Sequence, residues 1–170
     1  MNAFVASSSD CPADIVFVVD ESGSIGSRNF ELMKSFLSQL VSRLDIDSGS
    51  TRVGLVTYST RVGTSFNLNE YTTVASVQSA IMALSYSRGK TNTADALAYV
   101  RTSMLTSSAG DRSNVSNVVV VLTDGESDDE RATQVSAKCI VIATTVGLFI
   151  GCMLKWRHLV NTCEVTAGCG

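Results

Sequence analysis

Hydrophobic and polar positions along this 170-residue chain alternate between the patterns of strands and helices. Residues 15–19 form a continuous aliphatic run, which is typical of a strand covered on both faces. Residues 28–44 instead space apolar side chains as on one face of a helix: Phe30, Met33, Leu37, Leu40, Val41 and Leu44. A second strand is predicted over 52–59. Residues 62–68 alternate after a very short connection, which favours an antiparallel hairpin partner.

Three further elements are predicted before residue 125. Apolar residues at helical spacing indicate helices over 74–84 and 93–105, and residues 118–122 form another fully buried strand. This order of elements predicts an α/β fold: a doubly wound, open, mostly parallel sheet with one antiparallel edge strand and helices on both faces. The length fits one domain that buries about two-thirds of its unfolded surface.

Oxygen-bearing side chains gather where two of the predicted strands end. Asp20 ends the first strand, and Asp124 follows the strand over 118–122. In open α/β sheets the working crevice lies beyond the carboxyl ends of the strands, so both carboxylates should face one crevice. Hydroxyl groups from two loops accompany them: Ser22, Ser24, Thr91 and Thr93. Carboxylates and hydroxyls without a nearby His or Cys suit Mg²⁺, Mn²⁺ or Ca²⁺ rather than zinc or copper.

The segments "DIVFVVDESGSIG", "GKTNTADAL" and "VVVVLTDGES" resemble, in order, the three segments of a von Willebrand factor type A domain. In that family they form the metal-ion-dependent adhesion site (MIDAS). The resemblance runs from about Asp14 to Lys138 and implies a Mg²⁺ centre, or a Mn²⁺ or Ca²⁺ one. The ligands carried over by motif are Asp20, Ser22, Ser24, Thr91 and Asp124. The implied organisation is an N-terminal extension over 1–13, the type A-like domain over 14–151 and a divergent, cysteine-containing tail over 152–170.

Simpler interpretations of the same residues exist. Ser22 or Ser24 could cap a helix or a turn, although this leaves Asp124 and Thr91 unexplained. Thr93 is interpreted as a helix N-cap or as a hydroxyl behind the ligands, rather than as a ligand. Glu21 replaces the small residue often seen at its position in the family, and we expect it to face solvent. The acidic run over 126–131, beginning with Glu126, is interpreted as a solvated helix start.

Charge and motif content argue against two classes of function. The formal net charge is −3 and no basic stripe occurs, so nucleic acid is not an expected partner. The only histidine, His158, lies outside the region of resemblance, and no glycine-rich phosphate-binding motif occurs. No general base stands beside Asp20 and Asp124 in the sequence pattern. The chain is therefore not expected to be an enzyme.

Five cysteines leave at least one thiol free or paired between chains: Cys11, Cys139, Cys152, Cys163 and Cys169. The resemblance to matrix members of the family implies that Cys11 pairs with Cys163 or Cys169, while Cys139 stays buried and reduced. Asn114 begins an Asn-Val-Ser glycosylation sequon, which has meaning only in a secreted chain. No signal peptide is visible in the first residues.

The C-terminal part departs from the family pattern. Family spacing implies a helix over about 128–143 and a fifth strand over 144–151, and too few residues follow for the family's last three elements. The expectation is an incomplete C-terminus, whose uncovered sheet edge weakens folding and promotes association. A rival interpretation is a membrane span over 139–154. This segment carries no charge and precedes basic and aromatic residues, but covers only about 24 Å as a helix.

The resemblance implies a divalent-cation-dependent protein-binding module of the adhesion or extracellular matrix type. Its ion would take a Glu or Asp side chain from a matrix or cell-surface protein, and its location would be extracellular. Two alternatives stay open. One is an intracellular type A domain that serves as a scaffold subunit of a multiprotein complex. The other is a truncated product without independent function.

Overall fold

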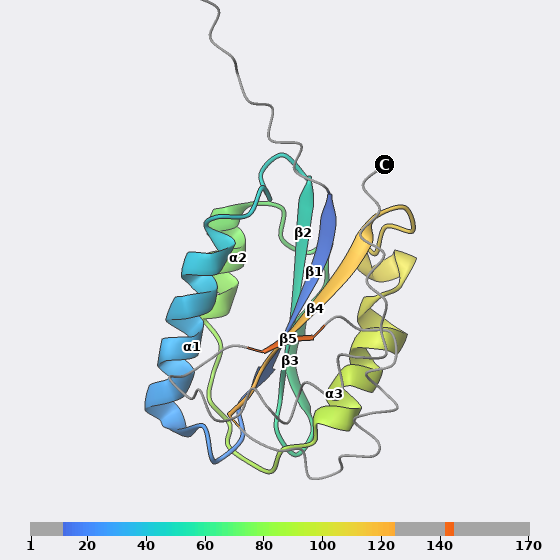
Figure 1. Ribbon diagram of the computed structural model, residues 1–170. Helices are drawn as coiled ribbons and strands as arrows, with labels where there is room; N and C mark the ends of the chain where they lie inside the picture. Colours follow the sequence, from blue (N-terminus) through green and yellow to red (C-terminus); the bar gives the residue numbers. More distant parts are fainter. Residues whose placement is uncertain (1–11, 125–141, 145–170) are drawn as a thin grey trace, which may run out of the picture.

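The strands of the chain form one mixed sheet (Figure 1). The computed structural model describes residues 12–124 and 142–144. Within them the sheet has the order β3-β2-β1-β4-β5. Its strands are β1 (Ala13–Asp20), β2 (Thr51–Tyr58), β3 (Val62–Phe66), β4 (Ser116–Leu122) and β5 (Ile142–Thr144). All neighbouring pairs are parallel except β2 and β3, which are antiparallel. The predicted doubly wound, mostly parallel sheet with one antiparallel edge strand is confirmed.

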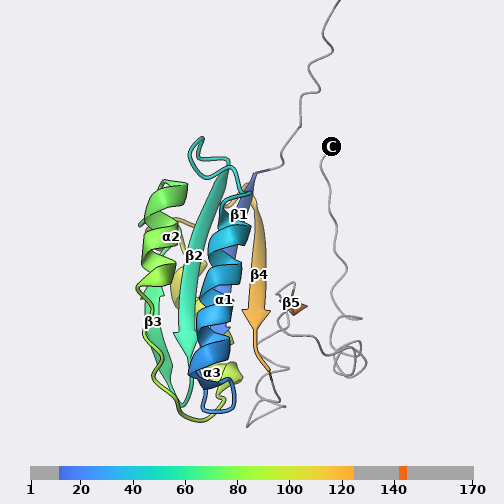
Figure 2. The same cartoon turned by 90° about the vertical axis from the view of Figure 1, so that its left-hand side faces the viewer.

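Helices cover both faces of this sheet, as the sequence predicted. Helices α1 (Gly26–Val41) and α2 (Val74–Met82) lie on one face, and α3 (Thr93–Tyr99) lies on the other (Figures 1 and 2). The helix predicted over 93–105 is in fact two segments, because α3 continues as a π-helical turn, η1 (Val100–Met104). A short 3₁₀ turn, η2 (Ser107–Ala109), precedes β4.

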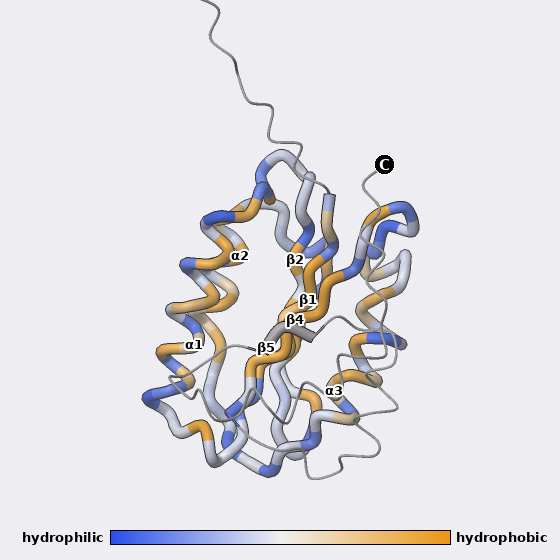
Figure 3. Tube along the Cα trace, viewed as in Figure 1, coloured by the Kyte–Doolittle hydropathy of each residue, from blue (hydrophilic) through white to orange (hydrophobic). Residues whose placement is uncertain are grey.

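The alternation of side chains along β1 divides the core into two layers. Val16 and Val18 pack towards α3 and η1, whereas Phe17 and Val19 pack towards α1 and α2. All four are at most 1% exposed. The continuous aliphatic run therefore follows from burial on both faces. Figure 3 shows the hydrophobic residues concentrated along β1 and β4, between the two helical layers.

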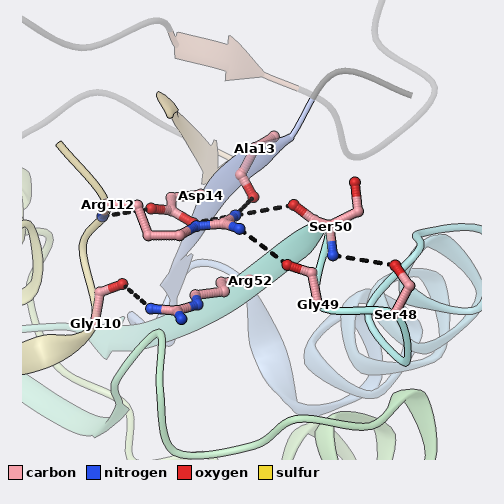
Figure 4. A network of polar contacts seen from close by, with 8 residues as sticks. All are labelled: Ala13, Asp14, Ser48, Gly49, Ser50, Arg52, Gly110 and Arg112. Atoms are coloured by element: carbon pink, nitrogen blue, oxygen red, sulfur yellow. Dashed lines mark hydrogen bonds and ion pairs between the residues drawn. The ribbon is translucent and has the colours of Figure 1, made fainter. Parts of the chain in front are cut away.

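A network of hydrogen bonds links chain segments at the end of the sheet where β1 and β2 begin (Figure 4). The Arg112 guanidinium donates to Asp14 Oδ1 from Nε at 2.9 Å and from Nη2 at 2.7 Å. It also donates to the backbone carbonyls of Ala13, Gly49 and Ser50 at 2.9–3.1 Å. Because Asp14 is completely buried, the ion pair is shielded from solvent on the carboxylate side. This network lies at the opposite end of the strands from Asp20.

The structure corrects one boundary near the C-terminus. Residues 142 and 143 were predicted to end a helix, but they belong to β5, which pairs with β4 in parallel. The physical reason is the local run of β-branched residues, which favours a strand over a helix. These residues are also not part of a helical span over 139–154. No helix in the two described ranges is long and apolar enough to cross a membrane. The rest of the predicted helix, strand and tail lies outside the described residues.

Candidate metal centre at the carboxyl ends of the strands

The carboxyl ends of the three central strands meet at one edge of the sheet. The register pairs Asp20 at the end of β1 with Tyr58 at the end of β2, and Val19 with Leu122 at the end of β4. Residues that directly follow these strands must therefore lie side by side. The site predicted from the two strand-end carboxylates is built on this edge.

Asp20 lies at the bottom of the site and has no exposed surface. Its Oδ1 accepts a hydrogen bond from the backbone N–H of Ser22 at 2.8 Å, and its Oδ2 accepts one from Thr123 Oγ1 at 2.7 Å. Burial raises the pKa of the Asp20 carboxyl above its usual range, and these hydrogen bonds offset the effect only in part. The nearby charge of Asp124 raises that pKa further. A cation in the site would relieve this electrostatic cost.

Three further oxygen-bearing side chains continue from Asp20 towards solvent. Ser22 Oγ and Ser24 Oγ are 3.1 Å apart, and Ser24 Oγ donates to Asp124 Oδ1 at 3.1 Å. Ser22 is buried, whereas Ser24 and Asp124 are exposed. Four of the five predicted ligands are thus brought together, although 100 residues separate Ser24 from Asp124. The four side chains therefore form a row from the buried Asp20 carboxylate to the solvent-exposed Asp124 carboxylate.

The fifth predicted ligand, Thr91, lies in the segment that enters α3. Backbone N–H groups on either side of it anchor this segment beside the end of β2: Lys90 donates to Thr60 Oγ1 at 3.0 Å, and Asn92 donates to the Ser59 carbonyl at 2.9 Å. Thr91 itself is half-buried. Its segment therefore stands next to the strand that pairs with β1, and its role as a ligand stays a prediction.

Thr93 is buried and contacts the end of β2. Its hydroxyl donates to the Tyr58 hydroxyl at 3.2 Å. It is not the N-cap of α3, because Asn92 takes that position and accepts from the backbone N–H of Asp95 at 3.2 Å. Burial, together with the charge of Asp20, raises the pKa of the Tyr58 hydroxyl, so this group stays protonated. The capping interpretation of Thr93 is wrong, and its role as a hydroxyl behind the ligands stays a prediction.

The two serines do not cap α1. The N-cap of α1 is Ile25, which makes no side-chain capping bond, and Gly26 follows it with φ +73°. Glycine is the residue that adopts this left-handed conformation most easily. Ser22 instead belongs to a turn that the Asp20 side chain closes through the Ser22 N–H. The hydroxyls of Ser22 and Ser24 therefore do not cap α1, and their contacts are with each other and with Asp124.

The expectation that Glu21 faces solvent is wrong. Glu21 is only 4% exposed, and its Oε1 accepts a hydrogen bond from Ser87 Oγ at 2.8 Å. Burial raises the pKa of its carboxyl, while the hydroxyls of Ser87 and Thr57 lower it and the charge of Asp20 raises it. The physical reason for the burial is the absence of a side chain at Gly63, which leaves room for the carboxylate beside β3.

Sequence reasoning also missed Tyr86 and Thr123. The Tyr86 hydroxyl donates to the Ser22 carbonyl at 2.8 Å and accepts from the backbone N–H of Gly26 at 3.1 Å, so it fastens the loop between β1 and α1. No local pattern marks Tyr86, because this contact spans 64 residues. Thr123 could have been suspected from its place between the end of β4 and Asp124.

The chemistry of this donor set fits a hard divalent cation. Neither Asp20 nor Asp124 takes part in an ion pair with another described residue. No group of three or more His, Cys, Asp and Glu side chains lies close enough together, among residues 12–124 and 142–144, to hold a metal. Two carboxylates with neighbouring hydroxyls match the oxygen ligands that Mg²⁺ and Ca²⁺ prefer. Glu126, the acidic run, His158 and all five cysteines lie outside the described residues.

Comparisons with known proteins agree with this geometry. Residues 14–151 match the family model of the von Willebrand factor type A domain. The collagen alpha-4(VI) chain of Mus musculus is 45% identical over 127 residues, which cover 74% of this chain and 6% of the collagen chain. Matrilin-4 of Homo sapiens is 42% identical over 120 residues, which cover 69% of this chain and 19% of matrilin-4. This chain therefore spans only a small part of these relatives.

A solved structure gives the same result for the fold. It is proximal thread matrix protein 1 from the mussel byssus, described with a zinc occupied MIDAS motif. The similarity has a TM-score of 0.69 and 29% sequence identity, and it covers 79% of this chain and 35% of the mussel chain. The family match, the sheet topology and the cluster of oxygen-bearing side chains lead to one conclusion: the chain belongs to the von Willebrand factor type A domain family.

Proposed function

We propose that this chain is a protein-binding module of the extracellular matrix type that works through a divalent cation held at its MIDAS. The observation that carries the proposal is the connected set of Asp20, Ser22, Ser24 and Asp124 at the carboxyl edge of the sheet. The collagen and matrilin relatives support a matrix setting and a role without catalysis. The zinc occupied motif of the mussel protein supports metal binding in this fold.

The proposed ligands of the ion are Asp20, Ser22, Ser24, Thr91 and Asp124. The donor chemistry favours Mg²⁺, with Mn²⁺ or Ca²⁺ as alternatives. With two carboxylates among its ligands, a bound ion keeps the ability to accept an acidic ligand from outside. Asp20 supplies a buried negative charge, while Ser24 and Asp124 stand at the solvent side, where a partner approaches. We infer that the partner is a matrix or cell-surface protein that offers a Glu or Asp side chain.

An extracellular location is part of this proposal, and Asn114 is consistent with it. The residue is exposed and lies in the turn before β4, where a glycan could be attached without disturbing the sheet. The turn lies at the end of the strands opposite the metal site, because β4 runs parallel to β1. A glycan there would leave the ligand-binding edge accessible.

The test is binding of the purified chain to an immobilised extracellular matrix extract, measured in Mg²⁺ and in EDTA. The proposal predicts retention in Mg²⁺, loss in EDTA and loss in the Asp124→Ala variant. Glu31→Ala is a matched control, because it removes an exposed carboxylate whose partner, Lys34, lies on the same helix. Binding that is absent in Mg²⁺, or that persists equally in EDTA and in Asp124→Ala, would contradict the proposal.

A further inference from the structure

Glu21 is a buried acid beside the proposed metal ligands, and the proposed function does not use it. It directly follows Asp20, yet only 4% of it is exposed. Its backbone N–H extends the pairing of β1 with β2 by donating to the Tyr58 carbonyl at 2.8 Å. No arginine or lysine among the described residues forms an ion pair with it. A buried carboxylate that only hydroxyl groups satisfy is unfavourable for stability, and this calls for another explanation of its presence.

The surroundings of the Glu21 side chain are shaped to hold it. A Cβ atom at Gly63 would lie 2.6 Å from Glu21 Oε1 and 2.5 Å from Thr57 Oγ1, closer than real side chains approach. Glycine at position 63 therefore lets the backbone of β3 pass close against the carboxylate. On the other side, Ser87 Oγ donates to Oε1 at 2.8 Å. The Glu21 carboxylate thus joins the loop after β1, which carries Ser22 and Ser24, to the segment between α2 and α3.

The segment between α2 and α3 also carries Thr91, and two further residues of it, Tyr86 and Gly89, contact the loop after β1. The backbone N–H of Gly23 donates to the Gly89 carbonyl at 2.9 Å. The Tyr86 hydroxyl donates to the Ser22 carbonyl at 2.8 Å. Residues 85 and 87–90 are exposed, and Tyr86, which packs against Phe30, is the apolar contact of residues 85–90 with the core. Lys90 and Asn92 anchor this segment to the end of β2, and its contacts with the loop after β1 set its position relative to Asp20. Among those contacts, the bond from Ser87 to Glu21 is the one made between two side chains.

We propose that Glu21 is a positioning residue, which holds the segment carrying Thr91 against the loop of Asp20, Ser22 and Ser24. The ligands from both loops are then already in position when the ion binds, so ion binding does not have to order the loops. This inference rests on the proposed function, because it takes the site to be a metal site. Glu21 acts through its hydrogen bond with Ser87, and it is not itself a ligand of the ion.

Isothermal titration of the chain with Mg²⁺ tests this inference. Glu21→Ala and Ser87→Ala should each weaken Mg²⁺ affinity roughly five- to ten-fold, the effect expected from the loss of one ordinary hydrogen bond. The double variant should be no weaker than either single variant, because both remove the same contact. Glu21→Gln keeps an oxygen acceptor for Ser87 and should bind within about two-fold of the wild type. Ser79→Ala is the matched control, since that hydroxyl bonds only within its own helix, to the Ala75 carbonyl.

Stability in EDTA distinguishes positioning from a merely structural role. Ser87 is exposed, so Ser87→Ala should unfold at the wild-type temperature in EDTA while it binds Mg²⁺ more weakly. Ser87→Ala therefore keeps the inference testable even if Glu21→Ala fails to fold. Unchanged affinity in Ser87→Ala would overturn the inference. So would an equal loss in Glu21→Gln and Glu21→Ala, because that result assigns the effect to charge. If the wild type itself does not bind Mg²⁺, the proposed function fails and this inference falls with it.

Discussion

Replacing Arg112 by alanine should destabilise the fold strongly without changing the metal site. The substitution removes five side-chain hydrogen bonds, two of them to Asp14 and three to backbone carbonyls (Figure 4). Asp14 keeps one bond, from the backbone N–H of residue 112 at 2.8 Å. Because its carboxylate is completely buried, it is left without a compensating charge. The expected loss in the free energy of unfolding is about 3–5 kcal/mol.

Arg52→Ala provides a matched control at the same end of the sheet. Among the described residues, Arg52 makes one side-chain bond, from Nη1 to the Gly110 carbonyl at 2.7 Å. The loss of this bond should lower the free energy of unfolding by only about 1–1.5 kcal/mol. Urea denaturation of both variants measures the difference. The double variant Asp14→Ala/Arg112→Ala should lose less than the sum of its single variants, because no unpaired charge remains. If Arg112→Ala costs no more than Arg52→Ala, the reasoning about the buried carboxylate is refuted.

Three further substitutions test the metal-site end of the sheet. Gly63→Ala should lower the free energy of unfolding by about 1–3 kcal/mol in urea denaturation, because its Cβ would overlap Glu21, and the Glu21→Ala background should relieve part of this loss. Tyr86→Phe leaves the Gly26 N–H without its partner and should cost about 1–2 kcal/mol in the same assay; an unchanged midpoint would contradict this. Thr93→Val removes a buried hydroxyl behind the site, so calorimetry should find Mg²⁺ affinity within about two-fold of the wild type, whereas a loss of direct ligation would weaken it far more.

The parts of the fold that rest on local periodicity could be predicted from the sequence. Burial on both faces of β1 makes Val16 to Val19 continuously apolar, and the alternation over 62–68 indicates a half-buried edge strand, as β3 is. The place of Asp20 and Asp124 followed from topology, because parallel strands bring their carboxyl ends together. The role of Thr93 as a helix cap was predicted wrongly, because Asn92 takes that position.

Features that depend on contacts distant in the sequence could not be predicted. The burial of Glu21 requires a glycine 42 positions later and a hydroxyl 66 positions later, and neither signal is visible near residue 21. The Tyr86 contact is equally remote. The change from α3 to a π-helical turn has no marker in the apolar spacing, since both helix types bury the same face. The early start of β5 shows that β-branched residues prevailed over the spacing expected from the family.

The central claim is that Asp20 and Asp124 hold a divalent cation, and thermal unfolding with and without Mg²⁺ tests it most directly. At Mg²⁺ concentrations about 100-fold above the dissociation constant, binding to the folded state alone should add about 2.7 kcal/mol. For a domain of this size that raises Tm by roughly 5–10 °C. Asp124→Ala removes an exposed carboxylate, so it should keep the wild-type Tm in EDTA and lose the rise, as should Asp20→Ala from its own baseline. A wild-type Tm that does not respond to Mg²⁺, or an equal rise in both variants, would contradict the account.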